Sequence, residues 1–220
     1  MVRPKCALIT DFDGTMTKTD FYELVVDQCL DPDAADYWTL YSSRAITHFE
    51  AMAGIFRHIV CSEQRVLGML ELMDADPAIP QAAARLKDCG WTVTVVSNGC
   101  DWYIQRIFAA LHVTFPLHSN PGTFVEGKGL VIELPEGSPF FSKETGISKA
   151  AVVQDALQRF ERVAFAGNGP PDLEPALMVP SRLRFACGWL ADELRRQGEG
   201  FRRFERWSEI ASMLCEEGVN

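Results

Sequence analysis

The sequence predicts an α/β fold: a doubly wound, Rossmann-like, mainly parallel sheet with an inserted all-helical cap and a small β-hairpin. Three observations support this prediction. Short apolar runs alternate with amphipathic helical segments along most of the chain, which is typical of a parallel sheet covered on both faces. Helical periodicity without a convincing strand interrupts this alternation at 20–73. Two β-prone runs flank a glycine-containing turn at 126–129, which indicates a hairpin.

The elements can be assigned in order along the chain. A first strand is expected at 6–10, an apolar run that stops at a polar turn. Acidic residues and two prolines at 74–80 indicate a hinge after the helical stretch. The later elements are a helix at 81–88, a strand at 91–96, a helix at 102–111, the hairpin within 120–134, a helix at 148–160, a strand at 162–166, a strand near 183–187 and two amphipathic helices. The predicted domains are therefore an α/β core at 1–17 and 78–220 and a helical cap at 18–77.

Composition narrows the classes of protein. The 220 residues are 47% apolar, enough for one packed core with a modest insertion. The net charge of −9 lacks the basic face that nucleic-acid binding needs, and the N-terminal apolar run is too short to cross a bilayer. We expect a cytoplasmic monomer or homodimer that binds neither nucleic acid nor membrane.

The cysteines and histidines carry no recognisable metal or disulfide pattern. Seven scattered cysteines, odd in number and without a C-x-x-C pair, argue against a disulfide framework or a zinc site and suit a reducing cytosol. The four histidines show no metal-ligand spacing, so ordinary surface or core roles are expected for them.

Three predicted strands end in polar loops that contain glycine. These loops begin at Asp11, Ser97 and Asn168. In a doubly wound sheet the active site gathers at the carboxyl ends of the strands. We therefore expect the three loops to converge on one site.

The first loop places two carboxylates, Asp11 and Asp13, at the mouth of a buried strand. Holding them together is costly unless a cation joins them, and Mg²⁺ prefers such hard oxygen ligands. Asp11 could then attack phosphorus while Asp13 exchanges a proton with the leaving oxygen. The alternative is that this D-x-D-G-T segment is only an acidic turn after a strand.

The other loops add groups that suit phosphate. Ser97 offers a hydroxyl, and with Asn98 and Gly99 it offers backbone N–H groups for phosphate oxygens, although such residues are also common in turns. Lys149 begins a predicted helix, where it opposes the helix dipole unless an anion lies nearby. Asp172 is either an ordinary helix N-cap or a partner for Lys149 or for the metal.

Together these motifs resemble the haloacid dehalogenase superfamily over nearly the whole chain. The resemblance is carried by DFDGT at 11–15, Ser97 after a hydrophobic strand, Lys149 at a helix start and G-N-x-x-x-D at 167–172. Within the superfamily the chain is similar to the branch with phosphoserine phosphatase and the methionine-salvage phosphatase that acts on 2-hydroxy-3-keto-5-methylthiopentenyl-1-phosphate. The methionine-salvage side is favoured by the features DFDGTMT-x-x-D at 11–20, D-L-E-x-A at 172–176, Phe185, Trp189-Leu190 and Glu193.

The resemblance implies a phosphatase with Mg²⁺ as cofactor and a small phosphorylated metabolite as substrate. It implies that Asp11 is the nucleophile and that Asp13 is the general acid and base and gives its backbone carbonyl to the metal. The implied phosphate-binding residues are Thr15, Ser97, Asn98, Gly99 and Lys149, and the implied metal ligands are Asp11, Asp13, Asn168 and Asp172. In the cap, Asp20, Glu23 and Arg57 are the candidates for substrate specificity.

One departure from the family pattern affects the metal site. Relatives normally carry an aspartate where this chain has Asn168, and an amide oxygen brings no negative charge to Mg²⁺. Pro170-Pro171 also stands where relatives often have a small or polar residue near the substrate. Two alternatives therefore stay open: a phosphotransferase that uses an acceptor hydroxyl, and a catalytically weakened binding or regulatory homologue.

Overall fold

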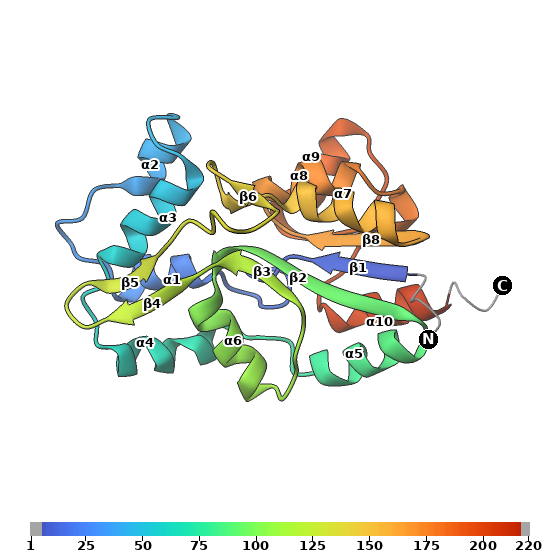
Figure 1. Ribbon diagram of the computed structural model, residues 1–220, viewed down its shortest axis with the longest axis horizontal. Coiled ribbons are helices and arrows are strands. Elements are labelled where there is room, and N and C mark those ends of the chain that lie inside the picture. Colours follow the sequence, from blue (N-terminus) through green and yellow to red (C-terminus); the bar gives the residue numbers. More distant parts are fainter. Residues whose placement is uncertain (1–5, 217–220) are drawn as a thin grey trace.

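The computed structural model describes residues 6–216, and its centre is one parallel sheet (Figure 1). The strand order is β10-β9-β8-β1-β2-β3, and β1 pairs in parallel with β2 and β8. Leu8 of β1 lies opposite Val93 on one side and Ala164 on the other. The strands are β1 (Cys6–Thr10), β2 (Trp91–Cys100), β3 (Leu117–Asn120), β8 (Arg162–Gly167), β9 (Arg184–Ala186) and β10 (Arg202–Arg203). This arrangement confirms the predicted doubly wound fold.

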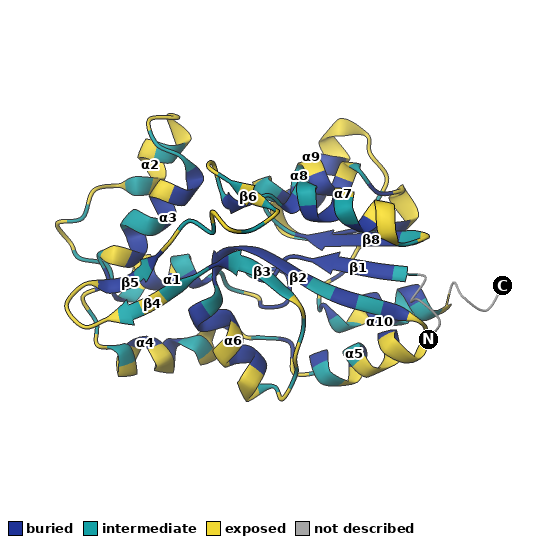
Figure 2. Cartoon of the chain, in the orientation of Figure 1, coloured by how far each residue is buried: buried dark blue, intermediate teal, exposed yellow. Residues whose placement is uncertain are grey.

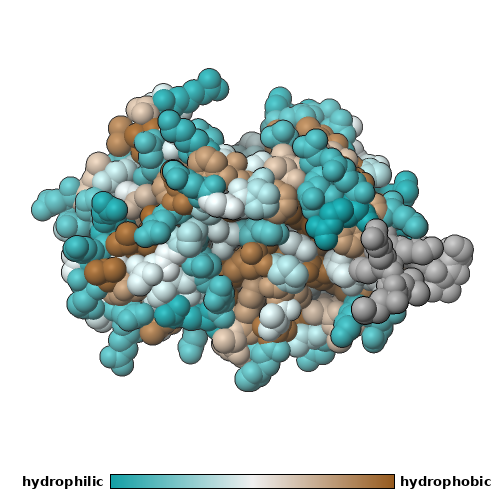
Figure 3. Space-filling model, in the orientation of Figure 1, coloured by the Kyte–Doolittle hydropathy of each residue, from teal (hydrophilic) through white to brown (hydrophobic). Residues whose placement is uncertain are grey.

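Helices cover both faces of the sheet (Figure 1). One face carries α5 (Ile79–Asp88), α6 (Asp101–Ala110) and α10 (Ser208–Glu216), and the other carries α7 (Lys149–Arg159), α8 (Leu173–Leu177) and α9 (Gly188–Gln197). Successive strand residues point to opposite faces. Leu8 accordingly packs in one hydrophobic cluster, and Ala7 and Ile9 pack in a second. Figure 2 shows the sheet strands as mainly buried, and Figure 3 shows hydrophilic residues around much of the rim of this face.

The segment between β1 and α5 is helical, as predicted. Its elements are α1 (Phe21–Gln28), α2 (Tyr37–Ser42), α3 (His48–Arg57), α4 (Glu63–Met69) and a 3₁₀ turn at Leu70–Met73. Thr47 and Glu50 form a capping box at the start of α3, which fixes where this helix begins. The proposed division into core and cap at 17/18 and 77/78 stays a prediction, and residues 1–5 and 217–220 of the core lie outside the described residues.

Two hairpins link the cap segment to the core. The predicted hairpin is formed by β4 (Gly122–Val125) and β5 (Gly129–Ile132). Gly129 has φ +68°, and a Cβ there would lie 2.3 Å from the carbonyl oxygen of Phe56, so β5 approaches α3 closely. A second hairpin, β6 (Phe141–Ser142) with β7 (Gly146–Ile147), was not predicted. The carbonyl of Glu144 in its turn accepts from the backbone N–H of Phe49 on α3 at 2.9 Å.

The predicted strand at 91–96 is too short. β2 continues through Ser97, Asn98 and Gly99 to Cys100, with an irregular register against β3 after Val96. These polar residues favour turns in isolation, but burial and pairing with a neighbouring strand override that preference. β3 and the two-residue β10 also escaped prediction, because their short sequences carry no clear alternation.

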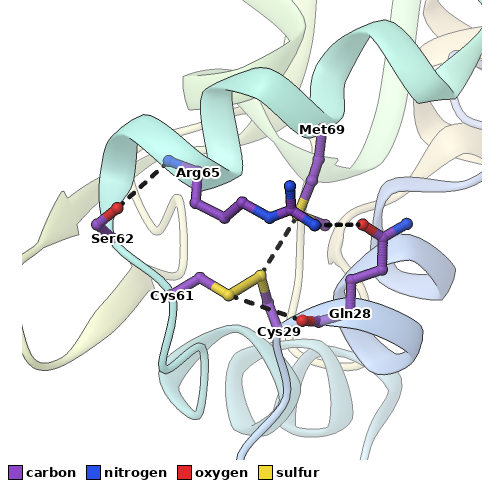
Figure 4. Close-up of a disulfide and its surroundings, with 6 residues drawn as sticks. All are labelled: Gln28, Cys29, Cys61, Ser62, Arg65 and Met69. Carbon is purple, nitrogen blue, oxygen red and sulfur yellow. Dashed lines mark hydrogen bonds between the residues drawn. A yellow bond between two sulfur atoms is a disulfide. The ribbon is translucent and has the colours of Figure 1, made fainter.

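The expectation that the cysteines form no disulfides is wrong. Cys29, after α1, is bonded to Cys61, before α4, and Cys89, after α5, is bonded to Cys215 on α10. Figure 4 shows the first bond beneath α4, and beside it Arg65 donates to the side-chain oxygen of Gln28 at 3.2 Å. The partners are 32 and 126 residues apart, so spacing along the chain gave no sign that the fold brings them together.

None of the helices within 6–216 combines the length and hydrophobicity needed to span a membrane.

Candidate active site

The three polar loops line one cavity at the carboxyl edge of the sheet. Asp11 follows β1, Ser97 lies near the end of β2 and Asn168 follows β8, and all three side chains line a cavity of about 110 Å³. The convergence follows from β2-β1-β8 adjacency in a parallel sheet. The other predicted residues that line this cavity are Asp13, Asp20, Asn98, Gly99, Lys149 and Asp172.

Three predicted residues do not line this cavity. The Thr15 hydroxyl donates to Oδ1 of Asn168 at 3.1 Å, so it supports the third loop. Glu23 and Thr15 line a separate pocket, and Arg57 is exposed at the end of α3. Their positions therefore give no support to the predicted contacts of Thr15 with phosphate or of Glu23 and Arg57 with substrate.

Lys149 joins two buried carboxylates. Its Nζ lies 2.7 Å from Oδ1 of Asp11 and 2.7 Å from Oδ1 of Asp172, and all three side chains are at most 8% exposed. Burial alone would lower the pKa of Lys149, but Asp11 and Asp172 together raise it, so the ammonium stays charged. Oδ2 of Asp11 makes no hydrogen bond to a described residue. One oxygen of Asp11, the nucleophile candidate, is thus held by Lys149, and the other has no hydrogen-bond partner among the described residues.

Lys149 owes its position to the local sequence. The Ser148 hydroxyl accepts from the backbone N–H of Ala151 and caps α7, which places Lys149 in the first turn. Asp172 is fixed in turn, because its Oδ2 accepts from the backbone N–H groups of Asn168 at 3.0 Å and Gly169 at 2.9 Å. Both oxygens of Asp172 therefore bind protein groups, which favours a positioning role over the predicted metal-ligand role.

Asp13 is held by three donors. Its Oδ1 accepts from the backbone N–H of Phe21 at 3.1 Å, and its Oδ2 accepts from the hydroxyls of Tyr103 at 2.6 Å and Ser97 at 3.2 Å. Burial nevertheless raises the pKa of Asp13 above its usual value, while these hydrogen bonds lower it. Because its pKa is raised, the Asp13 carboxyl group can hold a proton at a higher pH than an exposed aspartate can.

Tyr103 was missed by sequence reasoning. It lies in the first turn of α6, directly after β2, and it is 1% exposed with its ring stacked on Phe21 at 4.3 Å. Burial and the neighbouring Asp13 raise its pKa well above the usual value, so the hydroxyl remains a donor. The only signal was an aromatic residue with a polar tip just after a site-bearing strand, and the same sequence is typical of an ordinary core helix.

Several acidic side chains line this cavity. Burial, followed by repulsion from Asp172, raises the pKa of Asp11 well above its usual value. Burial also raises the pKa of Asp20 to about 8, with repulsion from Asp13 and Glu23 contributing. Among the described residues Lys149 is the one cationic side chain that lines the cavity. A further cation would lower the free energy of this arrangement.

The donors at this position fit Mg²⁺. Among residues 6–216 no three side chains of the usual His, Cys, Asp and Glu ligand types form a ready metal cluster. Mg²⁺ needs only one or two carboxylates, because water and substrate phosphate complete its shell. The open oxygen of Asp11, the Asn168 amide oxygen and the main-chain carbonyl of Asp13 form a donor set of this kind. The surplus of buried carboxylates gives the reason for a cation to bind.

Besides Asp20, four residues of the cap segment line the cavity: Tyr22, Trp38, His48 and Met52. The rings of Tyr22 and Trp38 stack with centroids 4.9 Å apart. His48 and Met52 lie on α3, and both are buried. The expected ordinary role for the histidines is therefore incomplete for His48, since this residue lines the candidate site. No sequence pattern distinguished these residues from other apolar positions of amphipathic helices.

A doubly wound sheet with a nucleophile candidate after its first strand defines the class, an α/β enzyme with its site at the carboxyl edge. A model of the haloacid dehalogenase-like hydrolase family matches residues 8–176. The chain belongs to this family, which confirms the resemblance inferred from its motifs. No curated protein matches the chain.

Solved structures show the same fold at low identity. A haloacid dehalogenase family hydrolase from Salmonella enterica subsp. enterica serovar Typhi is 15% identical, with a TM-score of 0.68 over 97% of this chain and 72% of that one. A substrate-bound phosphoserine phosphatase is 13% identical, with a TM-score of 0.66 over 94% and 96%. A probable phosphoserine phosphatase from Vibrio cholerae is 16% identical, with a TM-score of 0.63 over 99% and 68%. These similarities show that the chain shares its fold with phosphoserine phosphatases.

Proposed function

We propose that this protein is a Mg²⁺-dependent phosphatase that hydrolyses a small phosphomonoester through an aspartyl-phosphate on Asp11. The single observation that carries the proposal is the geometry of Asp11. One of its oxygens is bound to the Lys149 ammonium at 2.7 Å, and the other is open in a cavity where β1, β2 and β8 end. A carboxylate oriented by a cation and left with one reactive oxygen suits nucleophilic catalysis. The fold similarity to phosphoserine phosphatases supports this chemistry.

The residues divide the work of phosphoryl transfer. The Ser97 hydroxyl turns from Asp13 to a phosphate oxygen, which also frees the backbone N–H of Gly99 from its 2.9 Å contact with the Ser97 oxygen. The N–H groups of Asn98 and Gly99 then bind phosphate oxygens, and the Lys149 ammonium offsets their charge. The open oxygen of Asp11 forms a bond to phosphorus as the bond to the ester oxygen breaks, and Asp13 gives its proton to that oxygen. In the second step a water molecule attacks phosphorus and gives a proton to Asp13. The bond between phosphorus and the Asp11 oxygen breaks, which releases phosphate and restores the Asp11 carboxylate. Mg²⁺ supplies, when bound, positive charge for the transferred group.

The substrate is proposed to be a methionine-salvage-like or a phosphoserine-like metabolite. Screening a panel of phosphorylated metabolites for Mg²⁺-dependent phosphate release identifies it. The oligomeric state, monomer or homodimer, is measured by light scattering on the purified chain. The absence of nucleic-acid or membrane partners stays part of the proposal, which the net charge of −9 supports.

A cytoplasmic location also stays a proposal, and the two disulfides provide its test. Thiol alkylation in intact cells before lysis measures whether Cys29 and Cys61 are bonded there. Reduced cysteines support the reducing cytosol, and bonded ones favour an oxidising compartment.

Two alternatives have their own discriminators. Product analysis with and without an alcohol acceptor separates hydrolysis from phosphotransfer, because a transferase makes a new phosphoester. Asn168 motivates the second alternative, a catalytically weakened homologue. Such a protein would bind phosphorylated ligands without releasing phosphate.

The test of the main proposal uses p-nitrophenyl phosphate with Mg²⁺. The wild-type chain should release p-nitrophenol, EDTA should abolish the release, and Asp11→Asn should abolish it while Mg²⁺ remains present. Activity that survives the loss of Asp11 would contradict the proposal, since the nucleophile would have to lie elsewhere.

A further inference from the structure

The cap side of the cavity differs from its core side. Asp11, Ser97 and Lys149 supply charged and polar groups from the core. The cap segment supplies Tyr22, Trp38, His48 and Met52, which we call the cap wall. The stacked rings of Tyr22 and Trp38 make its flat apolar part. The organic group attached to a phosphate held on the core side faces this wall, because both sides line the same cavity.

Among the described residues Lys149 is the one cation that lines the cavity, and it lies on the core side. Lys149 is engaged by two carboxylates at 2.7 Å on the core side. Arg44 lines a neighbouring pocket and not this cavity, Arg57 is exposed, and Arg65 donates to Gln28 at 3.2 Å. Asp20, whose pKa burial raises to about 8, also lines the cavity and supplies no cation. A substrate carboxylate packed against the wall would thus lose part of its hydration without gaining a cationic partner there, which is costly.

His48 is the polar member of the wall. It is 8% exposed, its Nδ1 is buried without a hydrogen-bond partner, and no hydrogen bond to a described residue involves its Nε2. The rings of Tyr41 and Trp38 meet the imidazole edge-on at centroid distances of 5.3 and 6.2 Å. Burial lowers the pKa of His48 to about 4, with Lys149 adding to the effect, so the ring is neutral at pH 7. A neutral imidazole offers one donor and one acceptor.

Resting on the proposed phosphatase function, we propose that the cap wall selects phosphomonoesters whose organic part is uncharged. In this assignment an apolar portion packs on Tyr22, Trp38 and Met52, and one hydroxyl or carbonyl group hydrogen-bonds to the His48 ring. Esters that carry a carboxylate, such as phosphoserine, are excluded, so that of the two proposed substrate classes the methionine-salvage-like one is retained. His48 is then a specificity-determining residue, and the site differs in selectivity from the phosphoserine phosphatases whose fold it shares.

The first experiment compares kcat/KM for three esters. The organic part of phenyl phosphate is uncharged and apolar, that of glycerol 2-phosphate is uncharged and carries hydroxyls, and that of O-phosphoserine carries a carboxylate and an ammonium group. We expect phosphoserine to be slower than both others by about 100-fold, the scale of an unpaired buried charge or polar group. Equal or faster turnover of phosphoserine would overturn the inference and leave the phosphatase proposal standing.

Two variants make the test specific. Met52→Lys places a cation in the wall and should reduce the ratio of kcat/KM for phenyl phosphate to kcat/KM for phosphoserine about tenfold. Val26→Lys, at an exposed position of α1, should leave this ratio unchanged. His48→Phe keeps an aromatic ring and removes its nitrogens. It should raise KM for glycerol 2-phosphate about tenfold and leave KM for phenyl phosphate unchanged. An unchanged KM for glycerol 2-phosphate would overturn the role of His48.

A binding measurement separates this inference from the reaction itself. Calorimetry on Asp11→Asn with Mg²⁺ should give tighter binding of phenyl phosphate than of phosphoserine. If the wild-type chain releases no phosphate from any ester but this order of binding holds, the phosphatase proposal fails and the selectivity stands. If phosphoserine binds as tightly, the selectivity is overturned whether or not the chain is an enzyme.

Discussion

The Tyr103 hydroxyl donates to Oδ2 of Asp13 at 2.6 Å and ties α6 to the loop after β1. The same oxygen also accepts from the Ser97 hydroxyl at 3.2 Å. Together the two contacts fix the orientation of the Asp13 carboxyl group. The contact with Tyr103 also lowers the pKa of Asp13 against the effect of burial. Tyr103 is therefore a positioning residue for the proton transfer that we propose.

Replacing Tyr103 tests that role. Tyr103→Phe should lower kcat about tenfold, the worth of one good hydrogen bond, with little change in KM. The limb of the pH profile of kcat that belongs to Asp13 should move to higher pH, since a contact that lowers its pKa is lost. Tyr37→Phe is the matched control, because Tyr37 lies outside this cavity and its hydroxyl contacts His58 and not Asp13. Equal effects of both variants would contradict the assignment.

Asn168→Asp should strengthen Mg²⁺ binding and raise turnover. The change adds a negative charge to a ligand position and keeps an oxygen that can accept from the Thr15 hydroxyl. We expect about tenfold tighter binding in a calorimetric Mg²⁺ titration, together with a higher kcat. Without metal the added charge should lower the melting temperature, because the cavity already holds several carboxylates. Unchanged or weaker Mg²⁺ binding would remove Asn168 from the metal site.

The disulfide between Cys29 and Cys61 should stabilise the cap segment. It closes a loop with a sequence separation of 32, for which the loss of chain entropy in the unfolded state predicts about 4 kcal/mol. Cys61→Ser should lower the free energy of unfolding by this amount in urea titrations without reductant. With reductant, which also opens the Cys89–Cys215 bond in both proteins, the wild-type chain and the variant should be equally stable. A difference that persists in reductant would show that Cys61 contributes through packing and not through the bond.

The depressed pKa of His48 predicts a pH dependence of stability. An unfolded histidine titrates near 6.5, and His48 titrates at about 4 in the folded chain, so the unfolded state binds the proton more tightly. The contribution is fully present above pH 6.5 and is lost as the pH falls from 6.5 to 4, by about 3 kcal/mol. Urea unfolding at pH 7 and pH 4.5 measures it. His48→Phe should lack this part of the loss, and an equal loss in both proteins would show that His48 is not buried as a neutral ring.

Sequence reasoning reached the parts of the site that are bound to strand ends. Asp11 and Asn168 follow runs of buried strand residues and Ser97 lies near the end of β2, so the topology of a parallel sheet brings them together. Lys149 was recognisable because a cation at a helix start conflicts with the helix dipole. These inferences rest on local sequence and on one rule of topology, and the structure bears out their convergence.

Other features depend on tertiary packing that no local pattern encodes. Tyr103 and His48 lie at positions of amphipathic helices that look like ordinary core. Cys29, just after α1, and Cys61, just before α4, meet beneath α4, as Figure 4 shows. Thr15 lies in the motif that carries the nucleophile, but its hydroxyl turns to Asn168 and not to the cavity. Each of these depends on where a side chain points, which the period of the sequence does not fix.

The most direct test of the account is to trap the covalent intermediate. The chain is mixed with p-nitrophenyl phosphate and Mg²⁺, quenched in acid within one turnover and treated with borohydride, which reduces an acyl phosphate to an alcohol. Peptide mass spectrometry should then find homoserine at position 11 in place of Asp11, and no such change after quenching without substrate. Turnover with an unmodified Asp11, or reduction at another carboxylate, would contradict the assignment of the nucleophile.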